Sequence, residues 1–267
     1  MPLRQLLASL SVSEQVRQID FAVGEHCTAI LLGLPATLKA SDEKKLQHFA
    51  DQHEVVFYVQ PKGPDSVYRL YPGSEPNLSY TLPEFSVELA FLPSDFTQVN
   101  HAVNRVLVRR ALGLLDPQPG ERIADLFCGL GNFTLPIARS GARVLGVEGS
   151  DGLVRRGRES AEANALASQV DFAVANLFDC TADSLAALGH FDKMLIDPPR
   201  EGAMEVVSAF GDEAPKRIVY VSCNPATLAR DAAILVNTKG YRFVSVAAVN
   251  MFPHTAHVES IALFERA

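Results

Sequence analysis

Cys223 stands in a stretch whose pattern suits a reactive thiol. Residues 219–221 form an apolar, β-forming run, and Asn224 and Pro225 then break the strand and open a turn. Because proline suits the first turn of a helix, the pattern predicts a strand, a turn and a helix. Cys223 would lie at the carboxyl end of that strand, where ligands bind in open α/β sheets. The helix N-terminus would lower the pKa of the thiol; a small core residue is the alternative interpretation.

A glycine-containing turn at residues 125–133 could bind a cofactor. Gly129 and Gly131 let the backbone turn tightly and approach a ligand closely. Glu148 ends the next predicted strand, where a carboxylate can accept hydrogen bonds from both ribose hydroxyls. Leu135 occupies the place of the third small residue of a dinucleotide motif, so the sequence favours S-adenosylmethionine, which has no pyrophosphate. A structural turn beside a surface acid is the alternative.

Two further polar groups follow predicted strands. Asn176 comes after the third strand and could contact an adenine, and Asp197 begins a rigid Asp-Pro-Pro-Arg turn after the fourth. Because the carboxyl ends of parallel strands share one edge, these side chains should lie in line with Gly129, Glu148 and Cys223. Such a row of suitable groups favours one composite site over five unrelated turns.

The elements that would position these residues alternate between strands and helices from Arg122 onward. This alternation predicts an α/β fold with a parallel sheet. No helix is predicted between residues 243–249 and 260–264, so we expect these last two strands to pair antiparallel. Residues 1–92 predict a smaller α+β domain that serves as a platform, and residues 93–267 predict the catalytic domain.

Composition restricts the classes of function. The chain has 267 residues, 48% of them hydrophobic, and no apolar run is long enough to cross a membrane. The four cysteines form no C-x-x-C pair, which argues against a zinc site or a disulfide framework and favours the cytoplasm. A net charge of −7 argues against binding nucleic acid by charge alone, although a local basic face stays possible. No protein partner is indicated.

Five segments together resemble the RNA uracil-C5 methyltransferases, and most of all the type that modifies a uridine of bacterial 23S ribosomal RNA. The Cys-Asn-Pro motif followed by His-x-x-His-x-Glu is the most specific part. The resemblance implies a class I, Rossmann-like S-adenosylmethionine-dependent fold and methylation of uridine C5 in RNA. The segments are residues 96–100, 125–133, 197–200, 222–231 and 251–259.

The resemblance also implies roles for single residues. Cys223 matches the nucleophile, which adds to C6 of uracil, and Glu259 matches the general base. His254 and His257 have no third ligand at hand, so we expect no metal site. Positions that bind S-adenosylmethionine in the family correspond to Gln98, Phe127, Asn132, Glu148, Asn176 and Asp197.

One departure from the family concerns the start of the chain. Members of the ribosomal type begin with a small β-barrel RNA-binding domain and a cysteine cluster that holds an iron–sulfur centre, and this sequence contains neither. We therefore expect a fragment that begins just after that cluster.

Three alternatives stay open at this point. The substrate could be transfer RNA, or an amine held by the Asp-Pro-Pro turn with Cys223 only structural. The chain could also be a cofactor-binding core that is inactive without its RNA-binding domain.

Overall fold

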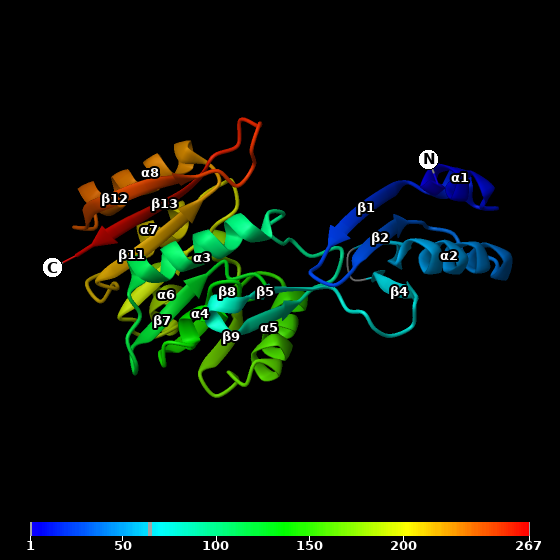
Figure 1. Ribbon diagram of the computed structural model, residues 1–267. Coiled ribbons are helices and arrows are strands. Elements are labelled where there is room, and N and C mark those ends of the chain that lie inside the picture. Colours follow the sequence, from blue (N-terminus) through cyan, green and yellow to red (C-terminus); the bar gives the residue numbers. More distant parts are fainter. Residues whose placement is uncertain (1, 64–65, 267) are drawn as a thin grey trace. The chain divides into compact units, whose positions relative to one another are not determined.

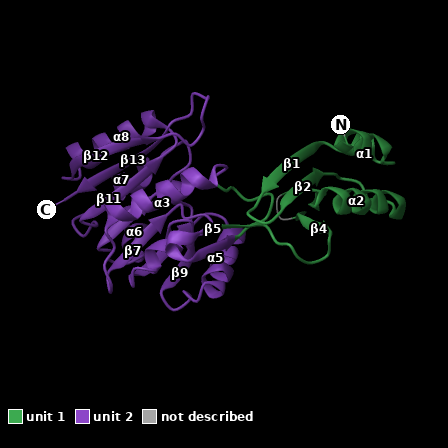
Figure 2. Cartoon of the chain, in the orientation of Figure 1, with its two compact units in different colours: residues 1–81, 90–97 green, residues 82–89, 98–267 purple. Residues whose placement is uncertain are grey.

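The computed structural model describes residues 2–63 and 66–266, which form two compact units (Figure 2). Unit 1 comprises residues 1–81 and 90–97, and unit 2 comprises residues 82–89 and 98–267. The domain boundary predicted after residue 92 falls within the second segment of unit 1. The division of labour between a platform and a catalytic domain stays a prediction.

Unit 1 is a four-stranded sheet covered by helices. Helix α2 connects two parallel strands, β2 and β3, and buries Leu46 against Phe57 and its neighbours in one apolar core. The sequence predicts a helix over residues 41–53 with Ser41 as its cap, but in the structure the residue before α2 is Lys39, which provides no side-chain cap. The sheet order is β1 (Gln18–Val23), β2 (Thr28–Gly33), β3 (Val55–Gln60), β4 (Tyr68–Tyr71); the helices are α1 (Pro2–Ser9) and α2 (Ala40–His53).

Between these segments the chain forms β5 (Ser79–Leu82) and β6 (Val87–Ala90), which pair as a two-stranded sheet. Residues of this pair are divided between the two units. The sequence predicts a short strand over residues 87–91, which β6 confirms, whereas β5 was not predicted.

Unit 2 contains a seven-stranded sheet in the order β12-β13-β11-β10-β7-β8-β9 (Figure 1). Strands β7 to β11 are parallel to one another, while β13 is antiparallel to both β11 and β12. The predicted α/β class and the antiparallel final pair are both confirmed. The strands are β7 (Arg122–Leu126), β8 (Arg143–Glu148), β9 (Val170–Val174), β10 (Lys193–Ile196), β11 (Arg217–Ser222), β12 (Arg242–Val249) and β13 (Glu259–Glu265).

Helices connect and cover these strands. Helix α3 begins after Asn100, whose side chain accepts a hydrogen bond from the Val103 backbone N–H. Helix α8 begins with Pro225 after the Asn224 cap, as the sequence predicts. The helices are α3 (His101–Leu115), α4 (Thr134–Ala138), α5 (Asp151–Ala163), α6 (Ala182–Ala187), α7 (Met204–Ala209) and α8 (Pro225–Asn237).

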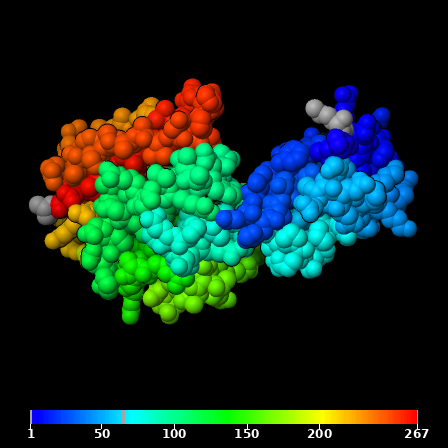
Figure 3. All heavy atoms as spheres, viewed as in Figure 1, coloured from blue at the N-terminus to red at the C-terminus, as the bar shows by residue number. Residues whose placement is uncertain are grey.

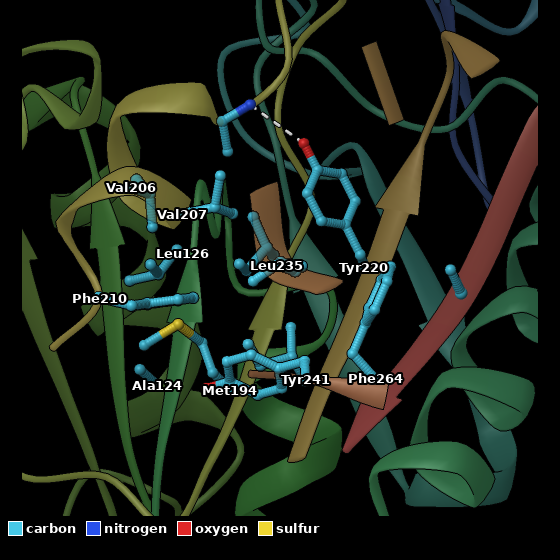
Figure 4. Close-up of a cluster of buried hydrophobic side chains, with 14 of the residues drawn as sticks. Ala124, Leu126, Met194, Val206, Val207, Phe210, Tyr220, Leu235, Tyr241 and Phe264 are labelled. Atoms are coloured by element: carbon cyan, nitrogen blue, oxygen red, sulfur yellow. Dashed lines mark hydrogen bonds between the residues drawn. The ribbon is translucent and has the colours of Figure 1, made fainter. Parts of the chain in front are cut away.

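The core of unit 2 joins the sheet to α7 and α8. Figure 4 shows Leu126, Met194 and Tyr220 from three neighbouring strands in one buried cluster with Leu235 of α8. This packing fixes the carboxyl ends of β7, β10 and β11 next to one another. Strand order reverses on the two sides of β7, and in such sheets the crevice at this point is where ligands bind. Within the described part of the chain, no helix is long and apolar enough to span a membrane.

Candidate active site

The loop after β7 has the geometry of a ligand-binding turn. Phe127, Gly129 and Gly131 all have positive φ, at 62°, 55° and 94°. At Gly131 a side chain would be strained by its φ and would touch the ring of Phe172 at 3.4 Å. The turn therefore brings bare backbone to the carboxyl edge of the sheet.

Glu148 is held against this turn by two backbone donors. The Gly129 N–H donates to Oε2 of Glu148 at 3.2 Å, and the Ser150 N–H donates to Oε1 at 3.0 Å. A carboxylate has about four acceptor sites, so each oxygen can accept a further hydrogen bond. The side chain is half-buried and pre-oriented at the end of β8, the position that suits a ribose diol.

Asn132 and Asn104 tie the same loop to helix α3. Asn104 Nδ2 donates to Asn132 Oδ1 at 2.8 Å, and Asn132 Nδ2 donates to Asn104 Oδ1 at 3.1 Å. Asn104 is buried, so its amide needs this partner. Gln98 is half-buried in the segment that leads into α3. The sequence did not single out Asn104, whose signal is an amide on the apolar face of a helix.

The segment after strand β9 forms a local cap and contacts an aromatic ring from the loop after β7. The rings of Phe127 and Phe178 lie 5.6 Å apart between centroids, and Phe178 stays partly exposed. Asn176 is exposed; its Oδ1 accepts from the Phe178 N–H at 3.1 Å, and its Nδ2 donates to Asp179. Asn176 thus shapes its own turn and sets the position of Phe178. The sequence did not identify Phe178 as a candidate residue of the site.

Asp125 is a buried acid that the sequence placed in the motif without a role. Thr134 Oγ1 donates to its Oδ2 at 2.5 Å, while Oδ1 has no hydrogen-bond partner among the described residues. Burial, with a smaller contribution from Glu148, raises the pKa of Asp125 to about 7. An acid near the end of an apolar strand is the signal that could have identified it.

Asp197 begins the turn after β10. Its backbone N–H donates to the Leu126 carbonyl at 3.2 Å, which fixes the turn to the end of β7. Burial, then the charges of Glu259 and Asp125, raise the pKa of Asp197 well above its usual range. The Leu126 contact thus holds Asp197 at the end of β7, the strand that carries Asp125.

Cys223 lies directly after β11 and is half-buried. Burial, then Glu259 and Asp197, raise the pKa of its thiol, and the opposing effect of Arg200 is smaller. The pKa of this thiol is therefore raised rather than lowered as expected from the helix N-terminus, because burial and the two acids outweigh the lowering effects of a backbone hydrogen bond and of Arg200. Arg200 itself is exposed at the lip of the site.

Glu259 reaches the same place through strand pairing. Ser222 of β11 pairs with Ser260 of β13 in antiparallel register, so the next residues along the two strands are Cys223 and Glu259. Glu259 is only 3% exposed, and burial raises its pKa to about 7. A carboxyl group with such a pKa can exchange a proton near neutral pH.

Other candidates are less suited to chemistry. Cys128 is buried, and burial raises the pKa of its thiol well above the usual value. His254 and His257 lie in the exposed segment between β12 and β13, coloured orange-red in Figure 3. No group of three potential metal ligands occurs among the described residues.

Two groups of arginines on predicted helices could contact RNA phosphates, and members of both have partners within the chain. The groups are Arg105, Arg109 and Arg110, and Arg155, Arg156 and Arg158. Arg158 Nη2 donates to the Phe172 carbonyl at 2.6 Å, and Arg109 lies 3.8 Å from Glu84. Both residues thus have partners in unit 2, which leaves a role of these clusters in RNA binding as a prediction.

Comparison with known sequences identifies the family. The family described as "tRNA (Uracil-5-)-methyltransferase" matches residues 84–267. The 23S rRNA (uracil(1939)-C(5))-methyltransferase RlmD of Dechloromonas aromatica is 72% identical over 99% of this chain and 61% of its own length. The RlmD of Azoarcus sp. is 60% identical over 99% of this chain and 61% of its length. The chain thus spans about three fifths of these curated relatives.

Solved structures agree with this assignment. The tRNA (uracil-54, C5)-methyltransferase of Pyrococcus abyssi, in complex with S-adenosyl-L-homocysteine, has a TM-score of 0.70 at 26% identity, over 91% of this chain and 58% of that one. The precorrin-6y C5,15-methyltransferase of Geobacter metallireducens shares the fold, with a TM-score of 0.52 at 16% identity. The match extends over 61% of this chain and 89% of that one. The chain has the Rossmann-like fold of these methyltransferases and belongs to the tRNA (uracil-5-)-methyltransferase family.

Proposed function

We propose that this protein methylates C5 of a uridine in RNA, with S-adenosylmethionine as methyl donor and 23S ribosomal RNA as substrate. The observation that carries the proposal is the meeting of a thiol and a buried carboxyl group, Cys223 and Glu259, at the ends of paired strands. The ribosomal substrate is supported by relatives named RlmD at 54 to 72% identity. Such a substrate would place the protein in the cytoplasm.

The residues of the carboxyl edge fit S-adenosylmethionine. The buried Asp125 and the half-buried Asp197 and Glu148 would favour a cation, and Asp125 Oδ1 lacks a partner among the described residues. Glu148 would hold the ribose, Gly129 and Asn132 would contact the donor along the glycine turn, and Gln98, Phe127, Asn176 and Asp197 would complete the site. When bound, S-adenosylmethionine supplies the methyl group that C5 of uracil receives.

The protein groups would activate both the carbon and its proton. C5 of uracil is a weak nucleophile, so the Cys223 thiolate adds to C6 and leaves carbanion character at C5. After C5 carries the methyl group, the Glu259 carboxylate removes the C5 proton. The electrons of that C–H bond form the C5–C6 double bond, and the C6–S bond breaks to return the thiolate. The raised pKa of Glu259, about 7, makes it a stronger base than an exposed carboxylate.

The target base must reach a thiol that is half-buried between α8 and the Asp197 turn. Uracil in a stacked helix cannot do so, which implies an unpaired loop or a flipped base. The exposed Arg200 guanidinium, next to Cys223, suits contact with a phosphate of that nucleotide. The net charge of −7 argues against binding of RNA by overall charge alone, so such local contacts would carry the binding.

The decisive experiment incubates the chain with S-adenosylmethionine and two RNAs, a 23S ribosomal RNA fragment and a transfer RNA, and maps methylation by mass spectrometry. We expect 5-methyluridine in the ribosomal fragment. Methylation of transfer RNA alone would reject the ribosomal substrate, and an N-methylated base would reject the C5 chemistry. Cofactor binding without methylation of either RNA would indicate a binding core that depends on the remaining domains.

A further inference from the structure

Asp231 is a buried acid of helix α8 that the proposed chemistry does not use. Its side chain is 0% exposed. Oδ2 accepts from the Tyr220 hydroxyl at 2.6 Å and from the Ala203 backbone N–H at 2.8 Å. Oδ1 accepts from the Arg230 guanidinium at 2.8 Å. A buried carboxylate needs such a complete set of partners, so Asp231 joins a strand, a loop and a helix.

The loop that Asp231 holds is the one that carries Asp197. Asn224 Nδ2 donates to the Arg200 carbonyl at 2.9 Å, Thr227 Oγ1 donates to the same carbonyl at 3.3 Å, and Arg230 Nη2 donates to the Glu201 carbonyl at 2.9 Å. Asn224, Thr227 and Asp231 follow one another at helical spacing, so one face of α8 meets the whole loop.

Gly202 shows how closely the loop and the helix approach each other. Its φ is +81°, and a Cβ there would lie 2.7 Å from Asp231 Oδ2 and 2.6 Å from Arg230 Nη2. Any side chain at this position would push the loop away from α8. The loop and α8 thus meet in a close joint, and their hydrogen bonds hold the loop in place. The joint is formed by residues 200–203 of the loop and by Asn224, Thr227, Arg230 and Asp231 of the helix and its cap.

We infer that Asp231 is a positioning residue, which fixes the loop of residues 197–203 against α8 and so sets the place of Asp197 and Arg200 relative to Cys223. Cys223 immediately precedes the Asn224 cap of α8, and Asp197 begins the loop, so a shift at the joint changes the distance between these groups. The inference rests on the proposed function, in which Asp197 and Cys223 act at one reaction centre. Tyr220 supports Asp231 from β11, three residues before the nucleophile.

The test compares two buried tyrosines of the same core, both labelled in Figure 4. Tyr220→Phe removes the hydroxyl that donates to Asp231. Tyr241→Phe is the matched control, because its hydroxyl donates to the Pro215 carbonyl at 2.5 Å, outside the joint. Asp231→Asn is the stronger variant, and Tyr220→Phe keeps the test valid if that chain does not fold. Melting temperatures of all variants establish that they fold.

Two readouts separate positioning from stability. One is the pH dependence of alkylation of Cys223 by iodoacetamide, followed on the Cys223 peptide by mass spectrometry. The other is the single-turnover rate of RNA methylation. Burial and Asp197 now raise the pKa of Cys223, so a loosened loop should lower it. We expect Tyr220→Phe to speed alkylation of Cys223 by about threefold, which corresponds to a decrease of about half a unit in the thiol pKa. The same variant should slow methylation. Tyr241→Phe should leave both rates unchanged.

Equal effects of the two tyrosine variants on Cys223, or no effect of either, would overturn the inference. Alkylation needs no RNA, so this result stands independently of the proposed function. Failure of the wild-type chain to methylate RNA would count against the proposed function alone.

Discussion

Cys223 and Glu259 are next to each other because of the register between strands β11 and β13. Ser222 and Ser260 form the last pair of the ladder, and the two chemical groups come one residue beyond it. Burial, and then the charge of Glu259, raise the pKa of the Cys223 thiol. A shift of one residue in this register would turn the Glu259 side chain to the other face of the sheet.

Cys223→Ala should abolish methyl transfer, with a loss of roughly three orders of magnitude or more, because no thiolate can then activate C5. Binding of S-adenosylmethionine, measured by calorimetry, should stay close to that of the wild type. Cys180→Ala is the control, since Cys180 is another half-buried thiol of unit 2. Methyl incorporation by Cys223→Ala at the rate of this control would remove Cys223 from its role.

Glu259→Gln should accumulate RNA that is covalently bound to the protein. Without the carboxylate, the C5 proton stays in place after methylation, and the C6–S bond is not broken. A denaturing gel with labelled RNA should therefore show a band of reduced mobility. The double variant Cys223→Ala/Glu259→Gln should lack this band; its presence there would mean that another nucleophile forms the adduct.

Glu148→Ala should weaken binding of S-adenosylmethionine by about tenfold or more, since hydrogen bonds to a charged group contribute about 1.5 to 3 kcal/mol. The Gly129 and Ser150 N–H groups also lose their acceptor in this variant. Glu159→Ala, which changes an exposed acid on α5, provides the control in the same titration. Equal affinities of the two variants would refute the ribose assignment.

The stability of Glu259→Gln relative to the wild type should rise with pH. Burial raises the pKa of Glu259 from 4.5 in the unfolded chain to about 7 in the folded one, so the folded state holds a proton longer. The protonated Glu259 side chain therefore contributes fully to the stability of the wild-type chain below pH 4.5, and this contribution is lost as the pH rises through 7. The difference in free energy of unfolding should therefore grow by on the order of 3 kcal/mol between these limits.

Urea unfolding of both chains at acidic, neutral and mildly alkaline pH checks this difference. Asp125 titrates in both chains and cancels in the comparison. Parallel stability curves would show that Glu259 does not carry the raised pKa.

Strong local patterns explain which elements could be predicted from sequence. Strands β3, β8, β10 and β11 each centre on an apolar run that by itself predicts a strand. The short helices α6 and α7 were not predicted, since six residues carry too little periodicity and such helices depend on packing. The prediction that Ser41 caps α2 was also wrong, because Ser41 lies within the helix.

The sequence by itself determined which groups follow the strands, because turn residues and apolar runs are local signals. Cys223 after β11, Glu148 at the end of β8 and Asp197 after β10 all follow from such patterns. Only the tertiary structure decided that Glu259 reaches Cys223 and that Asp231 holds the Asp197 loop. It also reversed the expected shift of the Cys223 pKa, because burial and approaching charges depend on residues far apart in the chain.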